Sequence, residues 1–146
     1  MAEALILDAE AVHSLARAAE RSVLALRARA ILGVAHERGA LVRIPAPVLA
    51  EVCRGARFDA AVNHLLNDHG IGVADLTRQT AQRAGAILAR AKLSSQHAVD
   101  AFVVATALEF AAAIIATGDP SDLRRLAAPY KQLRLFSLDV GGQTSR

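Results

Sequence analysis

The sequence is poor in aromatic and sulfur-containing residues. Tryptophan is missing, aromatic residues make up 3% of the 146 residues, and Cys53 is the single cysteine. One cysteine excludes an internal disulfide and a zinc site built from several thiolates. With so few aromatic side chains and 53% hydrophobic residues, the core must be aliphatic and rich in alanine. This composition favours closely packed helices over a disordered chain.

Signals for export and membrane insertion are also missing. The first residues lack a basic segment followed by a long apolar stretch, so no signal peptide is predicted. The longest apolar span, residues 98–116, is interrupted by Asp100 and Glu109, which favours a buried helix and strand over a membrane crossing. We therefore expect a cytoplasmic protein without a membrane partner.

Lysine is rare as well, since Lys92 and Lys131 are the only two and arginine supplies the other positive charges. The chain has 17 basic and 14 acidic residues, and its net charge of +3 permits a nucleic-acid partner without requiring one. Arginine suits phosphate binding, but a GC-rich coding sequence produces the same composition.

Short apolar runs alternate with helical patterns along the chain. The runs lie at residues 4–7, 41–44, 71–76, 113–117 and 133–136. This alternation predicts an α/β fold with three layers (α/β/α) and a central, mostly parallel sheet of about five strands. We expect one domain over residues 1–137 and a disordered tail over residues 138–146.

The first helical pattern covers residues 10–38, with a break expected near Glu20 and an end at Gly39. Apolar residues recur in it at spacings of three and four, which predicts a stripe that mostly faces the core. The stripe consists of Val12, Leu15, Ala19, Val23, Leu26, Ala30 and Val34.

Four carboxylates stand at the ends of predicted elements. Asp8 and Asp119 each follow an apolar strand. Glu51 lies one turn into a helix, and Asp100 begins the most apolar helix. Each has an ordinary explanation as a helix cap or first-turn acid. A parallel sheet would bring all of them to one edge, where they would repel one another without a cation. Oxygen ligands select Mg²⁺ or Mn²⁺ over zinc.

The turn after the fourth strand has the residues of a helix start. Asp119 stands at the N-cap position, Pro120 at the first helical position, and Asp122 three residues after the cap, as in a capping box. Capping alone would explain both aspartates. We favour a functional role for Asp119 and a capping role for Asp122.

These residues together resemble the PIN domain, and more closely the VapC-like toxin ribonucleases of bacterial type II toxin–antitoxin pairs. The resemblance extends from residue 5 to about residue 136. It is carried by the motifs Leu7-Asp8, Pro47-x-x-x-Glu51, Val99-Asp100-Ala101 and Thr117-Gly118-Asp119-Pro120-Ser121-Asp122.

The resemblance implies a PIN-like fold and a Mg²⁺- or Mn²⁺-dependent endoribonuclease. Such an enzyme hydrolyses RNA phosphodiester bonds, usually as a homodimer, and is silenced by a cognate antitoxin protein. The resemblance assigns catalysis to Asp8, Glu51, Asp100 and Asp119, and metal binding to Asp8, Asp100 and Asp119.

The chain departs from the family pattern after the first aspartate. Ser, Thr or Asn usually follows within two residues, whereas here Ala9 and Glu10 follow. A hydroxyl that often supports the first acid is therefore missing from this position. We interpret Glu10 as a solvated helix residue, with an extra acid of the site as the alternative.

The remaining polar residues are given structural interpretations. The histidines show no spacing typical of metal ligands and are assigned to the surface or to structural roles: His13, His36, His64, His69 and His97. Cys53 is interpreted as a small buried residue.

Two other functions stay open. One is a haloacid-dehalogenase-like phosphatase, because Asp8-Ala9-Glu10 is similar to its Asp-x-Asp motif and Lys92 would serve as its phosphate-binding lysine. That reading lacks the second aspartate and a cap domain, and it leaves Asp100 unexplained. The other is a PIN-like scaffold that binds RNA or protein without cutting, as the missing hydroxyl suggests.

Overall fold

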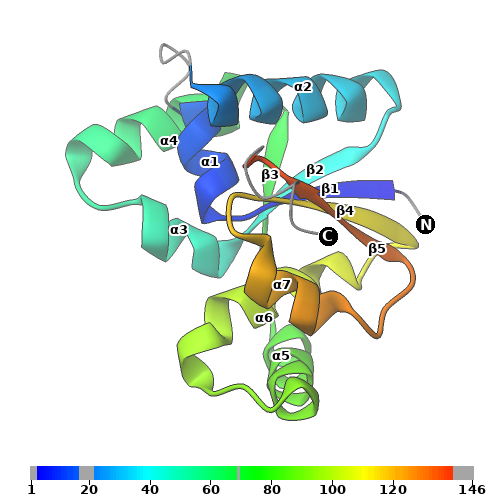
Figure 1. Cartoon of the computed structure of the whole chain (residues 1–146). Coiled ribbons are helices and arrows are strands. Elements are labelled where there is room, and N and C mark those ends of the chain that lie inside the picture. Colours follow the sequence, from blue (N-terminus) through cyan, green and yellow to red (C-terminus); the bar gives the residue numbers. More distant parts are fainter. Residues whose placement is uncertain (1–2, 17–21, 69, 140–146) are drawn as a thin grey trace.

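A computed structural model describes residues 3–16, 22–68 and 70–139 (Figure 1). The predicted break at Glu20 and most of the predicted tail, from residue 140 onward, lie outside these residues. The elements are β1 (Glu3–Leu7), α1 (Ala9–Ala16), α2 (Val23–Glu37), β2 (Leu41–Pro45), α3 (Ala46–Val52), α4 (Ala56–Asp68), β3 (Ile71–Ala74), α5 (Arg78–Ala91), the 3-10 turn η1 (Ser95–His97), α6 (Ala98–Ala107), β4 (Ala112–Thr117), α7 (Pro120–Ala127) and β5 (Leu133–Ser137).

The strands form one five-stranded sheet in the order β3-β2-β1-β4-β5. All neighbouring strands pair in parallel, which confirms the predicted α/β fold. The chain builds outward from β1 through β2 to β3, then returns to the other side of β1 with β4 and β5. The strand order thus reverses between β1 and β4, and open α/β sheets bind ligands at the carboxyl ends of the strands at such a point.

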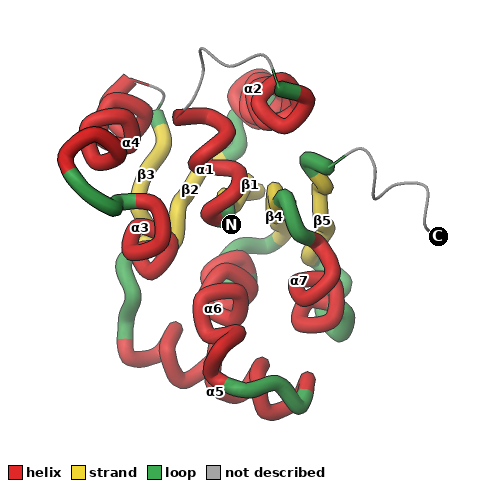
Figure 2. Tube along the Cα trace, turned by 60° about the vertical axis from the view of Figure 1, so that its left-hand side comes forward, coloured by secondary structure: helices red, strands yellow, loops and turns green. Residues whose placement is uncertain are grey.

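Helices cover both faces of the sheet. Helices α1, α2 and α4 lie on one face, and α6 and α7 lie on the other, with α5 packed outside α6 (Figures 1 and 2). Helix α3 follows β2 directly and contacts both α1 and α6. It therefore lies between the two helical layers at the carboxyl end of β2 (Figure 2).

The strands and α6 form the centre of an aliphatic core. Leu5, Ile6 and Leu7 of β1 are almost fully buried, as is Ile115 of β4. Helix α6 buries small and β-branched residues such as Val103 and Val104 on several sides, as its near-continuous apolar sequence predicts. The central strand and central helix therefore hold the residues that follow them in fixed positions.

The apolar stripe predicted for residues 10–38 is only half correct. Val12 and Leu15 of α1 are buried, but Val23, Leu26 and Val34 of α2 are between 45% and 55% exposed. Helix α2 instead buries the face formed by Ala25, Ala28, Leu32 and Ala35. Two separate helices need not keep the same phase, so the stripe of the first does not continue into the second.

No helix within the described residues is both long enough and apolar enough to span a lipid bilayer.

Candidate metal centre

Asp8 stands immediately after β1 and is buried, with 8% of its surface exposed. Its Oδ1 accepts a hydrogen bond of 2.9 Å from the backbone N–H of Ala11, so Asp8 caps α1 as well. The pKa of Asp8 is raised to about 6, mainly by burial and in smaller part by the negative charges of Asp100 and Glu10. Hydrogen bonds from Thr117 and Ala11 oppose this rise. A cation beside Asp8 would stabilise its charged form.

Thr117 links the ends of the two central strands. It is fully buried at the end of β4, and its hydroxyl donates a hydrogen bond to the carboxylate of Asp8. The same oxygen accepts a 3.0 Å hydrogen bond from the backbone N–H of Asp119. The hydroxyl that is missing after Asp8 in the sequence is therefore supplied across the sheet. Sequence reasoning missed this role, although Leu7 pairs with Ala116 in the parallel register.

Asp100 lies in the first turn of α6 and is partly buried. Its pKa is raised to about 6, mainly by burial and then by the negative charges of Asp122, Glu51 and Asp119, while His97 opposes the rise. Asp100 also raises the pKa of Asp8. Carboxylates from the end of β1, from α3, from the β4–α7 turn and from α7 thus act on Asp100 through their charge.

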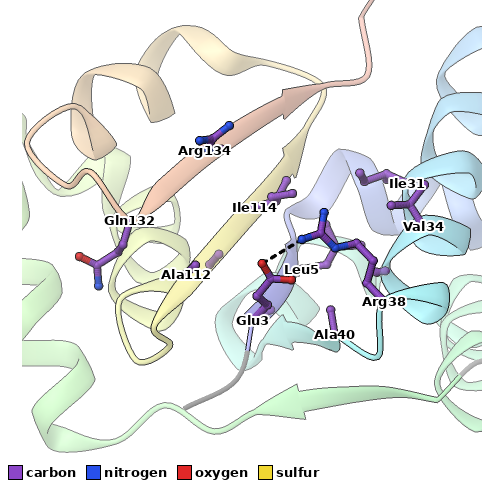
Figure 3. A pocket seen from close by; sticks show the side chains of 13 residues that line it. Glu3, Leu5, Ile31, Val34, Arg38, Ala40, Ala112, Ile114, Gln132 and Arg134 are labelled. Carbon is purple, nitrogen blue, oxygen red and sulfur yellow. Dashed lines mark hydrogen bonds and ion pairs between the residues drawn. The ribbon is translucent and has the colours of Figure 1, made fainter.

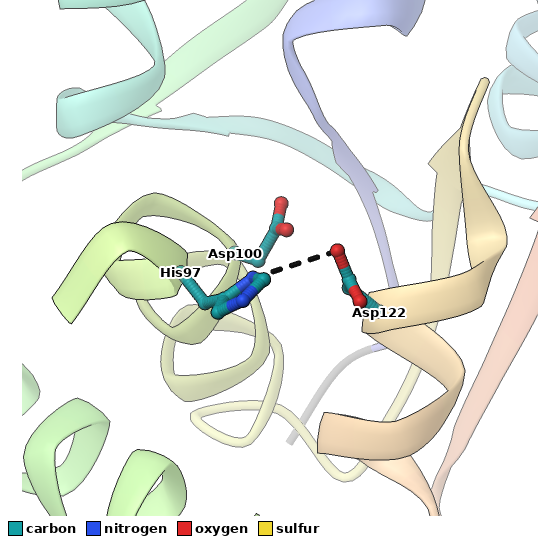
Figure 4. A group of neighbouring side chains, drawn as sticks. All are labelled: His97, Asp100 and Asp122. Carbon is teal, nitrogen blue, oxygen red and sulfur yellow. Dashed lines mark ion pairs between the residues drawn. The ribbon is translucent and has the colours of Figure 1, made fainter. Parts of the chain in front are cut away.

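The tightest group of donor atoms differs from the predicted one. Ligand atoms of His97, Asp100 and Asp122 all lie within 4.8 Å of one another (Figure 4). Asp100 was expected here, but His97 was assigned to the surface or structure, and Asp122 to a cap. The signal for His97 was its position three residues before Asp100, which places both at the start of one helix. Asp122 comes from α7, which packs against α6.

The predicted capping box at α7 is not formed. Asp119 occupies the N-cap position but makes no side-chain cap hydrogen bond. Its backbone N–H donates to Thr117, and its carboxylate accepts a 3.0 Å hydrogen bond from the Ser121 hydroxyl. The Asp122 carboxylate lies 3.4 Å from Nδ1 of His97. Asp122 therefore faces the acidic cluster instead of the helix end.

Glu51 and Asp119 are exposed at the rim of the cluster. Both act on Asp100 through their charge, but neither belongs to the group of three closely spaced donors. Glu10 is also exposed, and its side chain fills the space beside Gly118. Because Glu10 raises the pKa of Asp8, it is part of the electrostatic surroundings of the site.

A cavity of about 380 Å³ lies at the opposite edge of the sheet (Figure 3). It is lined by the amino ends of β1, β4 and β5 and by α2, including Leu5, Ile31 and Ile114. Its acid, Glu3, pairs with Arg38 at 3.1 Å. The cavity and the acidic cluster thus lie at opposite ends of the strands. The grouped carboxylates make the cluster the candidate functional site.

The donor set of the cluster fits a divalent cation. The carboxylates of Asp100 and Asp122 are oxygen ligands, and the imidazole of His97 is a nitrogen ligand. The raised pKa values of Asp8 and Asp100 reflect acids that are buried among other acids. Like charges held this closely are stabilised by a bound cation.

Comparison with known proteins agrees with this geometry. The PIN domain family model matches residues 5–129, a range that contains all of these acids. No curated protein matches the chain. Among solved structures, the chain is similar to VapBC2 from Rickettsia felis bound to a DNA fragment from their promoter, with 12% identity and a TM-score of 0.61. The match covers 93% of this chain and 99% of that chain, and at this identity it concerns the fold.

Proposed function

The chain belongs to the PIN domain family, and from this premise we propose that it is a metal-dependent endoribonuclease, the toxin of a toxin–antitoxin pair. The observation that carries the proposal is the convergence of acids on Asp100 at the point where the strand order reverses. PIN domains are generally nucleases, and acids gathered in this way suit phosphodiester hydrolysis assisted by a cation.

Four of the acids are suited to holding the cation. Asp8, Asp100 and Asp119 are the metal ligands that we propose, with Asp122 as an addition from the geometry. When bound, Mg²⁺ or Mn²⁺ would neutralise phosphate charge and lower the pKa of a water molecule. Thr117 and Ala11 fix the Asp8 carboxylate through hydrogen bonds, so its position does not depend on the cation alone.

The exposed acids are suited to contact with water and RNA. Glu51 is exposed and close enough to Asp100 to raise its pKa. We assign it the task of orienting the attacking water through a hydrogen bond to its carboxylate. The Asp119 carboxylate is held by the Ser121 hydroxyl at the mouth of the β4–α7 turn. Both side chains can therefore act without entry of the substrate into the core.

The proposal includes a cognate antitoxin protein and a homodimer. A similar fold is present in VapBC2 bound to a promoter fragment, which supports an antitoxin as partner. Val23, Leu26 and Val34 are exposed and share one side of α2 by helical periodicity. Exposed apolar side chains that are grouped in this way are typical of protein interfaces.

The non-catalytic scaffold is the alternative to this proposal, because no hydroxyl residue follows Asp8 within two positions. The hydroxyl of Thr117 supports the Asp8 carboxylate and favours the catalytic role. The phosphatase has no support from family membership, since the PIN model spans residues 5–129.

Expression in a growing bacterium tests the proposed function. The wild-type chain expressed alone should arrest growth, and the Asp8→Asn chain should not. The purified wild-type chain should cut RNA in Mg²⁺ or Mn²⁺ and stop cutting in EDTA. Equal growth of both strains at matched levels of folded protein, together with no cleavage by the wild type in either metal, would reject the proposal.

A further inference from the structure

We propose that His97 supplies a nitrogen ligand to the metal of this site, so that the site binds Mn²⁺ in preference to Mg²⁺. The inference rests on the proposed function, because it takes the acidic cluster to be a metal centre. It adds His97 to the proposed metal ligands and states that this residue favours Mn²⁺.

The position of His97 supports a role as ligand. Its Nδ1 lies 3.4 Å from Oδ2 of Asp122, and a donor atom of Asp100 lies within 4.8 Å of both side chains. Figure 4 shows the imidazole and the Asp122 carboxylate facing each other, with the Asp100 carboxylate beside them. Ligands about 2.1 Å from one ion lie roughly 3 to 4 Å apart, so these separations suit a shared cation.

A capping role does not account for this position. His97 is the N-cap residue of α6, yet its side chain makes no cap hydrogen bond. The 3.4 Å separation from Asp122 is longer than the roughly 2.7–3.2 Å of an N–H···O hydrogen bond. The imidazole is nevertheless largely buried, with 19% of the side chain exposed. The imidazole is therefore held beside the Asp122 carboxylate at ion-pair distance, where a bound cation would replace the proton that a charged imidazole carries.

The type of donor decides which cation is preferred. Mg²⁺ is a hard cation that takes oxygen ligands and keeps several waters. Carboxylates suit Mg²⁺ and Mn²⁺ alike, whereas imidazole nitrogen is a ligand of first-row transition metals, so one imidazole added to two carboxylates favours Mn²⁺, the transition metal of the two. A site of carboxylates alone would discriminate less between the two ions.

The test compares two histidine-to-asparagine variants of the full chain. His97→Asn replaces the nitrogen ligand with an amide, and His36→Asn changes an exposed histidine of α2 as a matched control. Titration calorimetry measures the affinity of each protein for Mn²⁺ and for Mg²⁺. Pulsed electron paramagnetic resonance of the Mn²⁺-loaded proteins detects a coupled ¹⁴N nucleus. Neither measurement depends on RNA cleavage.

We expect nitrogen coupling in the wild type and in His36→Asn, and its loss in His97→Asn. The affinity of His97→Asn for Mn²⁺ should fall about 10-fold or more, while its affinity for Mg²⁺ changes much less. A wild type that binds Mn²⁺ and cuts RNA without nitrogen coupling would overturn the inference and leave the proposed function standing. Coupling that persists in His97→Asn would overturn it too. A wild type that binds neither ion would reject both.

His97→Gln provides a second variant if His97→Asn does not fold, as judged by circular dichroism. It should lose the nitrogen coupling in the same way, because its amide also lacks the imidazole. Retained coupling in folded His97→Gln would assign the nitrogen to another residue and overturn the inference.

Discussion

The two ends of β1 carry acids in opposite surroundings. At the amino end, Glu3 is half exposed and pairs with Arg38 at 3.1 Å beside a cavity lined by apolar side chains. At the carboxyl end, Asp8 is buried and the neighbouring charges that raise its pKa are those of Asp100 and Glu10. One strand thus holds an acid that is neutralised by an arginine and an acid that is surrounded by other acids.

This difference shows why the cavity is a poor guide to the function of the chain. The amino end is hollow, but its acid has a partner within the protein and needs no ligand. The carboxyl end has the less stable arrangement, since burial and like charges both oppose ionisation of Asp8 and Asp100. Groups placed at such a cost are typical of functional sites.

The largest effect on RNA cleavage should come from replacing an acid at the carboxyl end of the sheet. Asp100→Asn removes the carboxylate on which the other acids converge, and we expect metal-dependent RNA cleavage to fall about 100-fold or more. Glu3→Gln, at the other end of the sheet, should leave the cleavage rate unchanged. Cleavage of a labelled RNA in Mn²⁺ measures both. A folded Asp100→Asn chain that cuts at the wild-type rate would show that the cluster is not the active site.

The next effect concerns stability in the absence of metal. The pKa of Asp8 is about 6 in the folded state instead of its usual 3.8, so the folded state binds a proton that the unfolded chain has lost between these pH values. The wild type should therefore lose stability as the pH rises from about 4 to about 6. Asp8→Asn stays neutral and keeps an oxygen for the N–H of Ala11. In EDTA at pH 7 it should be more stable than the wild type by about 1–3 kcal/mol.

Urea unfolding of both chains between pH 4 and pH 7 measures this difference. The two stabilities should lie closest together near pH 4 and separate as the pH rises. Added Mn²⁺ should narrow the gap, because it binds the folded wild type more tightly than Asp8→Asn. A gap that shrinks with rising pH in EDTA would contradict the raised pKa of Asp8.

A smaller effect is expected at Gly118, in the turn beside Asp119. A methyl group there would overlap Cγ of Glu10 and come within 2.8 Å of its Cβ. Gly118→Ala should therefore destabilise the chain by about 1–2 kcal/mol. Gly85→Ala in α5 is the matched control, since no atom lies within 4 Å of its added methyl group, and it should stabilise by up to about 1 kcal/mol.

A double variant separates steric overlap from other effects at this turn. Glu10→Ala combined with Gly118→Ala should recover part of the stability that Gly118→Ala loses, because it removes Cγ of residue 10 and leaves only the 2.8 Å approach to Cβ, as thermal melting would show. If Glu10→Ala gives no recovery, the overlap with Glu10 is not the cause.

Much of the fold could be predicted because its signals are local. Apolar runs bounded by turn residues locate the strands, and Thr77, a residue type that favours N-caps, caps α5 by accepting the N–H of Thr80. The exposed side of α2 was not predictable, since the phase of a helix depends on where it meets the sheet. Its exposed Val23 shows that apolar spacing alone does not identify the buried face.

The residues of the candidate site could likewise be predicted only in part. Asp8 and Asp119 could be placed together because parallel strands end at one edge of the sheet. His97 and Asp122 could not be brought together from the sequence, since their contact depends on how α6 packs against α7. The role of Thr117 was hidden for a similar reason, because its hydroxyl reaches Asp8 from the neighbouring strand.

The smallest effect is expected at the amino end, where Arg38→Gln removes the ion pair with Glu3. Both side chains are more than half exposed, so water and salt screen their attraction. The loss of stability should be about 0.5 kcal/mol at low salt and should disappear at high salt. A cycle with Glu3→Gln, followed by urea unfolding at both salt concentrations, isolates the pair energy. A pair energy above about 2 kcal/mol that salt does not reduce would mean that Glu3 is as constrained as Asp8, and the contrast between the two ends of β1 would fail.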